Sequence, residues 1–136
     1  MKLDDVDRKL LSLLKQTARM TNTALAKHVG LTEGAVRHRI DQLAKNGAIK
    51  RFTIDTSSES GFFAIVMTKA KDDPKKAIKD IVATKIPKEA YEISGEFDAC
   101  IILEGESIDD IDSEIDKIRK LKSVSDTKTF MVLRKW

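Results

Sequence analysis

The sequence predicts an α+β fold in two parts: a helical first part, and a second part whose elements follow the order βαββαβ. Three observations support this prediction. Apolar residues recur at helical spacing in residues 21–51, all periodicity stops in residues 57–61 (SSESG), and residues 62–136 alternate between strand and helix patterns. We therefore expect one domain over residues 1–55, a hinge over residues 56–61 and a second domain over residues 62–136.

Two short helices joined by a glycine turn are expected within residues 21–51. Their apolar residues recur on one side of each helix, namely Leu25, Ala26 and Val29 on the first and Val36, Ile40 and Leu43 on the second. Thr21 and Thr32 precede the two patterns and are suited to accept the free N–H groups of a first helical turn. Gly30 lies between the helices, where the chain needs a left-handed residue. The pattern is typical of a helix-turn-helix.

The second helix has a polar face opposite its apolar side, formed by Gly34, Arg37, His38, Asp41, Gln42 and Lys45, with Arg39 on the flank. Side chains of this kind can reach base edges or phosphates in a major groove. The helix start at Thr32 is suited to a phosphate contact as well as to capping. An alternative interpretation is that Arg37 and Arg39 only pair with Glu33 or Asp41 along the helix, and that His38 is simply exposed.

An extended segment is expected after this helix, over residues 49–54, as in winged relatives of the helix-turn-helix. Its two basic residues would contact the DNA backbone. The predicted DNA-binding residues are thus Thr32, Glu33, Gly34, Arg37, His38, Arg39, Gln42, Lys50 and Arg51. The charge distribution agrees, because residues 1–55 carry a net charge of +5 and residues 56–136 one of −2.

Composition excludes several classes of protein. Of the 136 residues, 41% are hydrophobic and 35% charged, which fits a globular chain whose small halves favour oligomerisation. No apolar run approaches the roughly 18 residues that cross a bilayer, and the first residues lack a secretion signal, so a cytoplasmic protein with no membrane partner is expected. Cys100 is the only cysteine, which excludes an internal disulfide, and its neighbours predict a buried strand position. No catalytic or metal-binding motif is present, so we expect neither an enzyme nor a metal site.

The second domain is expected to be a four-stranded antiparallel sheet with both helices on one face, the ferredoxin-like arrangement. The predicted strands are Phe62–Ala70, 90–94, 98–104 and 124–134, and the predicted helices are 74–84 and 107–121. The uncovered face of such a sheet needs a partner. In the last strand both faces become apolar towards the end, which favours dimerisation from sheet to sheet.

Residues 3–52 resemble the DNA-binding half of the Lrp/AsnC family, the leucine-responsive or feast/famine regulators of bacteria and archaea. The family pattern is matched by Leu3, Asp4, Asp7, Arg19, Leu25, Ala26, Gly30, Leu31, Leu43, Gly47 and Ile49. Glu33 and Gly34 depart from it, because many members carry proline and a small polar residue there. The abundance of Lys, Glu and Asp suggests a thermophilic source, and the resemblance is to the archaeal type.

The resemblance continues in the second half, which is similar to the regulator-of-amino-acid-metabolism (RAM) module of the same family. The signature turn of that module is matched by Gly95, Glu96, Phe97 and Asp98. The resemblance implies a transcription regulator of amino acid metabolism that binds double-stranded DNA. It also implies homodimers that assemble into octamers, with an amino acid effector at the turn and strand residues of a neighbouring dimer, here Thr127 and Thr129, completing the pocket.

The chemistry of the turn suits an amino acid, and no other cofactor is expected. An ammonium group is best met by carboxylates such as Asp98 or Glu96, and a carboxylate by backbone N–H groups and hydroxyls. The alternative interpretation is a plain hairpin connection with Phe97 packed beneath it. Two other functions remain open: an effector-independent architectural or chromatin-like DNA-binding protein, and a metabolite-sensing scaffold that acts on protein partners, against which the basic first half argues.

Overall fold

The computed structural model describes residues 2–54 and 61–136, and the chain divides into two compact units, Met1–Ser57 and Ser58–Trp136. Of the predicted hinge at residues 56–61, only Gly61 lies within the described residues. Within residues 2–54 and 61–136, no helix is long and apolar enough to span a membrane.

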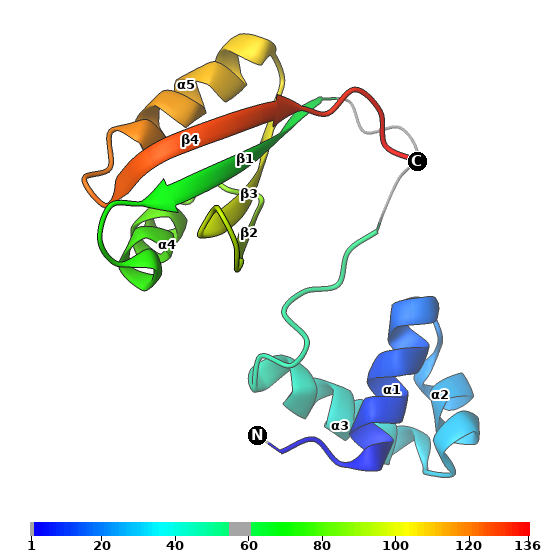
Figure 1. The fold of residues 1–136 in the computed structure, drawn as a ribbon. Helices are drawn as coiled ribbons and strands as arrows, with labels where there is room; N and C mark the ends of the chain where they lie inside the picture. The colour runs from blue at the N-terminus through cyan, green and yellow to red at the C-terminus, as the bar shows by residue number, and fades with distance from the viewer. Residues whose placement is uncertain (1, 55–60) are drawn as a thin grey trace. The chain divides into compact units, whose positions relative to one another are not determined.

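The first unit contains three helices, α1 (Asp5–Gln16), α2 (Asn22–Val29) and α3 (Glu33–Lys45) (Figure 1). The predicted caps are confirmed, because the Thr21 hydroxyl accepts from the Ala24 N–H at 3.1 Å and the Thr32 hydroxyl from the Ala35 N–H at 3.2 Å. Gly30 ends α2 with φ 70°, a conformation that costs an L residue with a side chain about 1–2 kcal/mol. The predicted helix-turn-helix is therefore present.

The three helices enclose one small core. Its fully or almost fully buried members are Leu10 of α1, Leu25 and Ala26 of α2, and Val36 of α3. Leu25, Ala26 and Val36 lie at the helical spacing that the sequence shows, and burial of one face of each helix explains why these short helices hold together. The expected extended segment after α3 is not a strand, since residues 50–54 contain neither helix nor strand.

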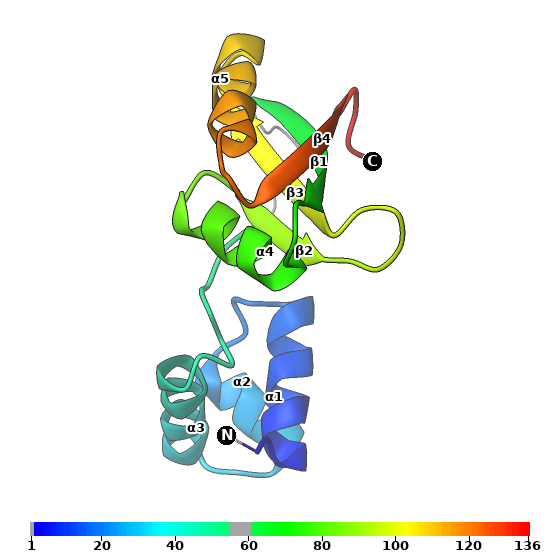
Figure 2. The same ribbon diagram turned by 60° about the vertical axis from the view of Figure 1, so that its left-hand side comes forward.

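The second unit contains β1 (Phe62–Ala70), α4 (Pro74–Ala83), β2 (Glu89–Glu92), β3 (Ala99–Gly105), α5 (Ile108–Arg119) and β4 (Val124–Met131). The strands form one antiparallel sheet in the order β2-β3-β1-β4, and Figure 2 shows both helices on the same face of it. The predicted ferredoxin-like arrangement is confirmed, with element bounds that differ from the expected ones by up to three residues. The last strand is the largest case, ending at Met131 and not at residue 134.

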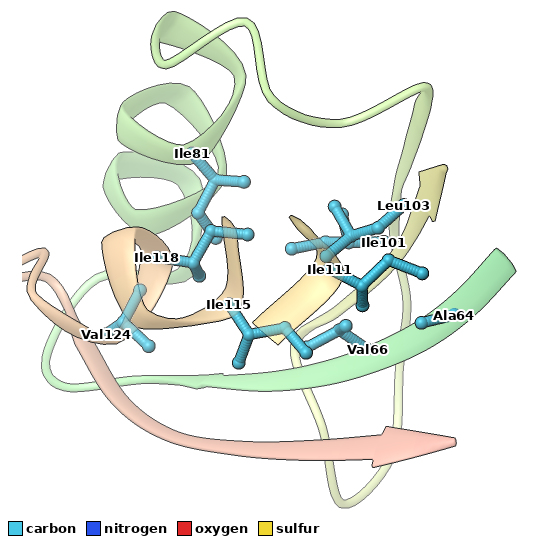
Figure 3. Close-up of a cluster of buried hydrophobic side chains, with 9 residues drawn as sticks. All are labelled: Ala64, Val66, Ile81, Ile101, Leu103, Ile111, Ile115, Ile118 and Val124. Carbon is cyan, nitrogen blue, oxygen red and sulfur yellow. The ribbon is translucent and has the colours of Figure 1, made fainter. Parts of the chain in front are cut away.

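The core of this unit lies between the sheet and its helices (Figure 3). It consists of nine buried side chains, Ala64, Val66, Ile81, Ile101, Leu103, Ile111, Ile115, Ile118 and Val124. On β1 and β3 every second residue is buried, as expected for a sheet that is covered on one face.

Among the described residues of the second unit, no helix covers the opposite face of the sheet, which is largely apolar. Strand pairing brings Ile65 beside Ile102 and Phe130, and the Phe130 side chain is 48% exposed. Cys100 also lies on this face, paired with Met67, and it is only partly buried. The expectation of a buried cysteine was therefore wrong, because its apolar neighbours in sequence alternate between a covered and an uncovered face.

Candidate nucleic-acid interface and effector site

Helix α3 presents the polar face that the sequence predicts. Arg37 and His38 are exposed, and Gln42 is partly exposed. Thr32 caps the helix, so its hydroxyl and the free N–H groups of the first turn lie together at one end of this face. A Cβ atom added at Gly34 would meet no atom within 4 Å, so the glycine lies on open surface beside the cap.

Arg37 makes an ion pair with Glu33 one turn earlier, at 2.7 Å between Nη2 and Oε2. Its side chain remains 61% exposed, and an exposed pair of this spacing contributes only a few tenths of a kcal/mol. Arg37 therefore forms the intrahelical pair of the alternative interpretation. Its exposed guanidinium can still exchange the Glu33 carboxylate for another anion. A phosphate could replace the Glu33 carboxylate at little cost.

The alternative interpretation paired Arg39 with Glu33 or Asp41, but the structure shows different partners. A single nitrogen of its guanidinium, Nη1, donates to Asp4 Oδ2 at 2.6 Å and to Asp7 Oδ1 at 2.8 Å, both at the start of α1. These hydrogen bonds raise the pKa of Arg39. The sequence could not show this contact, because the residues are more than 30 positions apart.

Lys50 and Arg51, which the sequence predicts as backbone contacts, are exposed and follow α3 in a segment without regular structure. The chain leaves α3 through Gly47 with φ 76°, and the Ile49 N–H donates to the Leu43 carbonyl at 3.0 Å. This capping bond fixes where the basic segment begins.

The turn at Gly95–Asp98 connects the antiparallel strands β2 and β3, so it is a hairpin connection, as in the alternative interpretation. The Ile93 N–H donates to the Asp98 carbonyl at 3.0 Å, and the Asp98 N–H donates to the Thr68 carbonyl at 2.9 Å. Gly95 has φ 121°, which favours glycine. The turn is therefore anchored to the end of β1 by backbone bonds.

The two acidic residues of the turn have different roles. The Asp98 carboxylate is partly buried and accepts from the Ala70 N–H at 2.8 Å, so one of its oxygens is used in holding β1. The Glu96 carboxylate is 76% exposed and lies 3.8 Å from the Lys69 ammonium. Of the two, Glu96 is the carboxylate that is free to meet a ligand.

Lys69 is a residue of this site that the sequence reasoning missed. Its ammonium nitrogen lies near the Glu96 carboxylate and 5.4 Å from the centre of the Phe97 ring. A carboxylate and an aromatic face are the groups that attract an ammonium ion. The Lys69 ammonium thus lies near both kinds of group. Its alternation with Ile65 and Met67 along β1 was the only available signal.

The structure does not bring Thr127 and Thr129 to the turn within one chain. Their partners on β1 are Thr68 and Val66, which are buried under the helices, so both threonines lie on the covered face of the sheet. The Thr129 hydroxyl is buried and has no hydrogen-bond partner among the described residues. The Thr127 hydroxyl accepts from Arg119 Nε at 3.0 Å and borders an open hollow of about 360 Å³.

The described residues contain no group of three or more His, Cys, Asp or Glu side chains placed to hold a metal ion.

Comparison with known proteins assigns a class to each unit. Residues 3–50 match the family model described as winged helix-turn-helix DNA-binding, and residues 61–136 match the one described as Lrp/AsnC ligand binding domain. The architecture is thus that of a DNA-binding protein with a ligand-binding domain.

The chain belongs to the Lrp/AsnC family of transcription regulators. It is 40% identical to the HTH-type transcriptional regulator LysM of Sulfurisphaera tokodaii, over 98% of this chain and 97% of that protein. This relative and a second LysM protein, of Saccharolobus solfataricus, are archaeal regulators, in agreement with the archaeal type that the sequence indicates.

Solved structures share the fold. The leucine response regulatory protein of Mycobacterium tuberculosis aligns with a TM-score of 0.82 and 24% identity, over 98% of this chain and 94% of that chain. A transcriptional regulator of Neisseria meningitidis, solved as an L-Met complex, aligns with a TM-score of 0.73 and 20% identity, over 98% of this chain and 92% of that one.

Proposed function

We propose that this protein regulates genes of amino acid metabolism by binding specific double-stranded DNA sites through α3, and that an amino acid modulates its affinity or assembly. The observation that carries the proposal is the exposed face of a capped α3 beside an exposed basic segment. Thr32, Glu33, Gly34, Arg37, His38 and Gln42 line that face, and Lys50 and Arg51 lie on the segment. Arg37 and His38 would reach base edges or phosphates, and Lys50 and Arg51 the backbone.

Arg37→Ala is expected to weaken binding to DNA from the protein's own promoter by about tenfold or more, since a contact to a base or phosphate is worth roughly 1–3 kcal/mol. Fluorescence anisotropy at several salt concentrations measures both the affinity and its salt dependence. A matched control is Arg8→Ala on α1, which removes an exposed guanidinium that pairs with Asp5 on the same helix. If the two variants bind alike, α3 is not the reading helix.

Competition with random DNA separates this function from that of an effector-independent architectural protein. A sequence-specific regulator is expected to prefer its own site by at least about 10³-fold. A protein that loses its promoter fragment to an equal concentration of random duplex is architectural.

For the effector, we propose a site at Gly95, Glu96, Phe97 and Asp98, completed in the assembled protein by strand residues that include Thr127 and Thr129. The neighbour with the same fold that was solved with L-Met supports an amino acid ligand. The Lys69 ammonium beside Glu96 and Phe97 supports it further, because it shows that this turn already accommodates a cationic amine. Dimers assembling into octamers would bring such turns and strand ends together.

Lys69→Met is expected to strengthen binding of the cognate amino acid several-fold, because it removes the cation that competes with the ligand ammonium. Glu96→Gln is expected to weaken it. A thermal-shift screen of the twenty amino acids on the wild type and both variants measures these changes. Glu96→Gln is a cleaner probe than Asp98→Ala, since loss of the Asp98 carboxylate leaves the Ala70 N–H without its partner. If no amino acid raises the melting temperature of any of the three proteins, the effector-independent function is favoured.

A further inference from the structure

We infer that Arg39 is a positioning residue for α3 and not a DNA contact: it binds the start of α1 and so sets the placement of the helix that reads DNA. This inference rests on the proposed role of α3. It removes one cation from the predicted DNA-binding set. It adds to the residues on which DNA affinity depends Asp4 and Asp7, which accept hydrogen bonds from Arg39 of α3.

The three side chains form a closed network. Asp4 is the N-cap of α1, and its Oδ1 accepts from the Asp7 N–H at 2.7 Å, while Asp7 Oδ2 accepts from the Asp4 N–H at 3.2 Å. The second oxygen of each carboxylate accepts from Arg39 Nη1. All four carboxylate oxygens are therefore used, one pair for the cap of α1 and the other pair for α3.

The burial of the three side chains supports a structural role. Exposed fractions are 13% for Asp7, 33% for Arg39 and 51% for Asp4, whereas Arg37 remains 61% exposed. The bonds to the Asp7 N–H and to Arg39 lower the pKa of Asp4, so it stays ionised. Both hydrogens of Nη1 are committed to Asp4 and Asp7, so a phosphate that bound Arg39 through this nitrogen would have to replace the two carboxylates.

The position of Arg39 on α3 allows the network to set the orientation of the exposed face of α3 that would contact DNA. It lies three residues after the buried Val36 and next to Ile40, which packs against the same core. Leu10 and Val36 fix the distance between α1 and α3, but apolar contacts are not directional. The charged hydrogen bonds of Arg39 add direction and fix the rotation of α3 about its own axis, which decides where Arg37 and His38 point.

Asp4→Asn separates an effect of charge from an effect of helix position, because the two predict opposite changes in DNA affinity. Asparagine is as good an N-cap as aspartate, so α1 is kept, but its single oxygen is already used by the Asp7 N–H. Arg39 therefore loses one acceptor. If only charge matters, removing an acidic residue should tighten binding to DNA. If Arg39 positions α3, we expect about threefold to tenfold weaker binding to the specific site.

Asp5→Asn is the matched control. Asp5 is the adjacent residue, its side chain is fully exposed, and among the described residues its only ion pair is with Arg8 on its own helix. The change in charge is the same as in Asp4→Asn, without a bond to α3. We expect equal or slightly tighter DNA binding for Asp5→Asn.

Arg39→Met supplies the second arm. Anisotropy titrations should show a loss of about tenfold for the specific site, a smaller loss for random DNA, and an unchanged dependence of log K on log salt. A lost phosphate contact would lower that slope by about 0.9. Adding Asp4→Asn to Arg39→Met should cost nothing more, because the network is already broken. Circular dichroism at the assay temperature reports the folded fraction, and partial unfolding would weaken both DNA ligands by the same factor.

Two results would overturn the inference: an Asp4→Asn protein that binds as tightly as Asp5→Asn, or an Arg39→Met protein whose salt slope falls by one contact. Failure of the underlying function looks different, because Arg37→Ala would then also leave binding unchanged. Should Arg39→Met be unfolded at the assay temperature, the Asp4→Asn and Asp5→Asn pair still decides the question.

Discussion

Replacing Leu25 with alanine is expected to lower the free energy of unfolding of the first unit by about 2–5 kcal/mol. The Leu25 side chain is 0% exposed and packs in the cluster that joins the three helices. A unit of this size has a small core and little stability to lose. We therefore expect a large fraction of the DNA-binding unit to be unfolded near physiological temperature.

Thermal and urea denaturation, followed by circular dichroism, measure the loss, and anisotropy should show a matching loss of DNA affinity. Leu133→Ala is the control, since Leu133 is 98% exposed and the same atoms are removed at no cost in packing. Equal melting curves for the two variants would contradict the core assignment.

Phe130→Asp is expected to weaken self-association by at least about 100-fold. The prediction rests on the uncovered sheet face, where Phe130 lies beside Ile65 and remains 48% exposed. If two copies pack these faces together, the new carboxylate is buried without a partner, which costs several kcal/mol. The free monomer should tolerate the change, because β4 is an edge strand and the side chain points to solvent.

Sedimentation equilibrium gives the dissociation constants. Val82→Asp on α4 is the control, because Val82 is similarly exposed, at 51%, but lies on a helix that covers the other face of the sheet. A Phe130→Asp protein with the mass of the wild type would show that the sheet face does not hold the copies together.

Much of the fold could be predicted from the sequence, because local interactions decide it. Thr21 and Thr32 cap the helices that they precede, and Gly30 takes the left-handed conformation that the turn requires. Phe62–Ala70 is a strand with the predicted bounds. Each depends on a hydrogen bond or dihedral angle within a few residues, or on burial of every second or every third to fourth side chain.

Less of the candidate sites than of the fold could be predicted from the sequence. The exposed face of α3 follows from helical spacing alone. The alternative partners considered for Arg39 were the wrong ones, because sequence separation gives no measure of proximity between helices. Thr127 and Thr129 could not be placed relative to the turn without the strand register, which puts them opposite Thr68 and Val66 under the helices. Lys69 was not predicted, because its alternation with Ile65 and Met67 along β1 does not by itself distinguish it from a solvated lysine.

By itself the sequence determined the helices α2 and α3 with their caps, the order of helices and strands in the second unit, and which face of α3 is polar. Only the tertiary structure decided that Arg39 binds the start of α1, that Lys69 lies against Glu96 and Phe97, and that Cys100 faces away from the core. The division has a physical cause. Helix periodicity, caps and turns are energies of neighbouring residues, whereas a contact between distant residues depends on how whole elements pack and on the register of their strands.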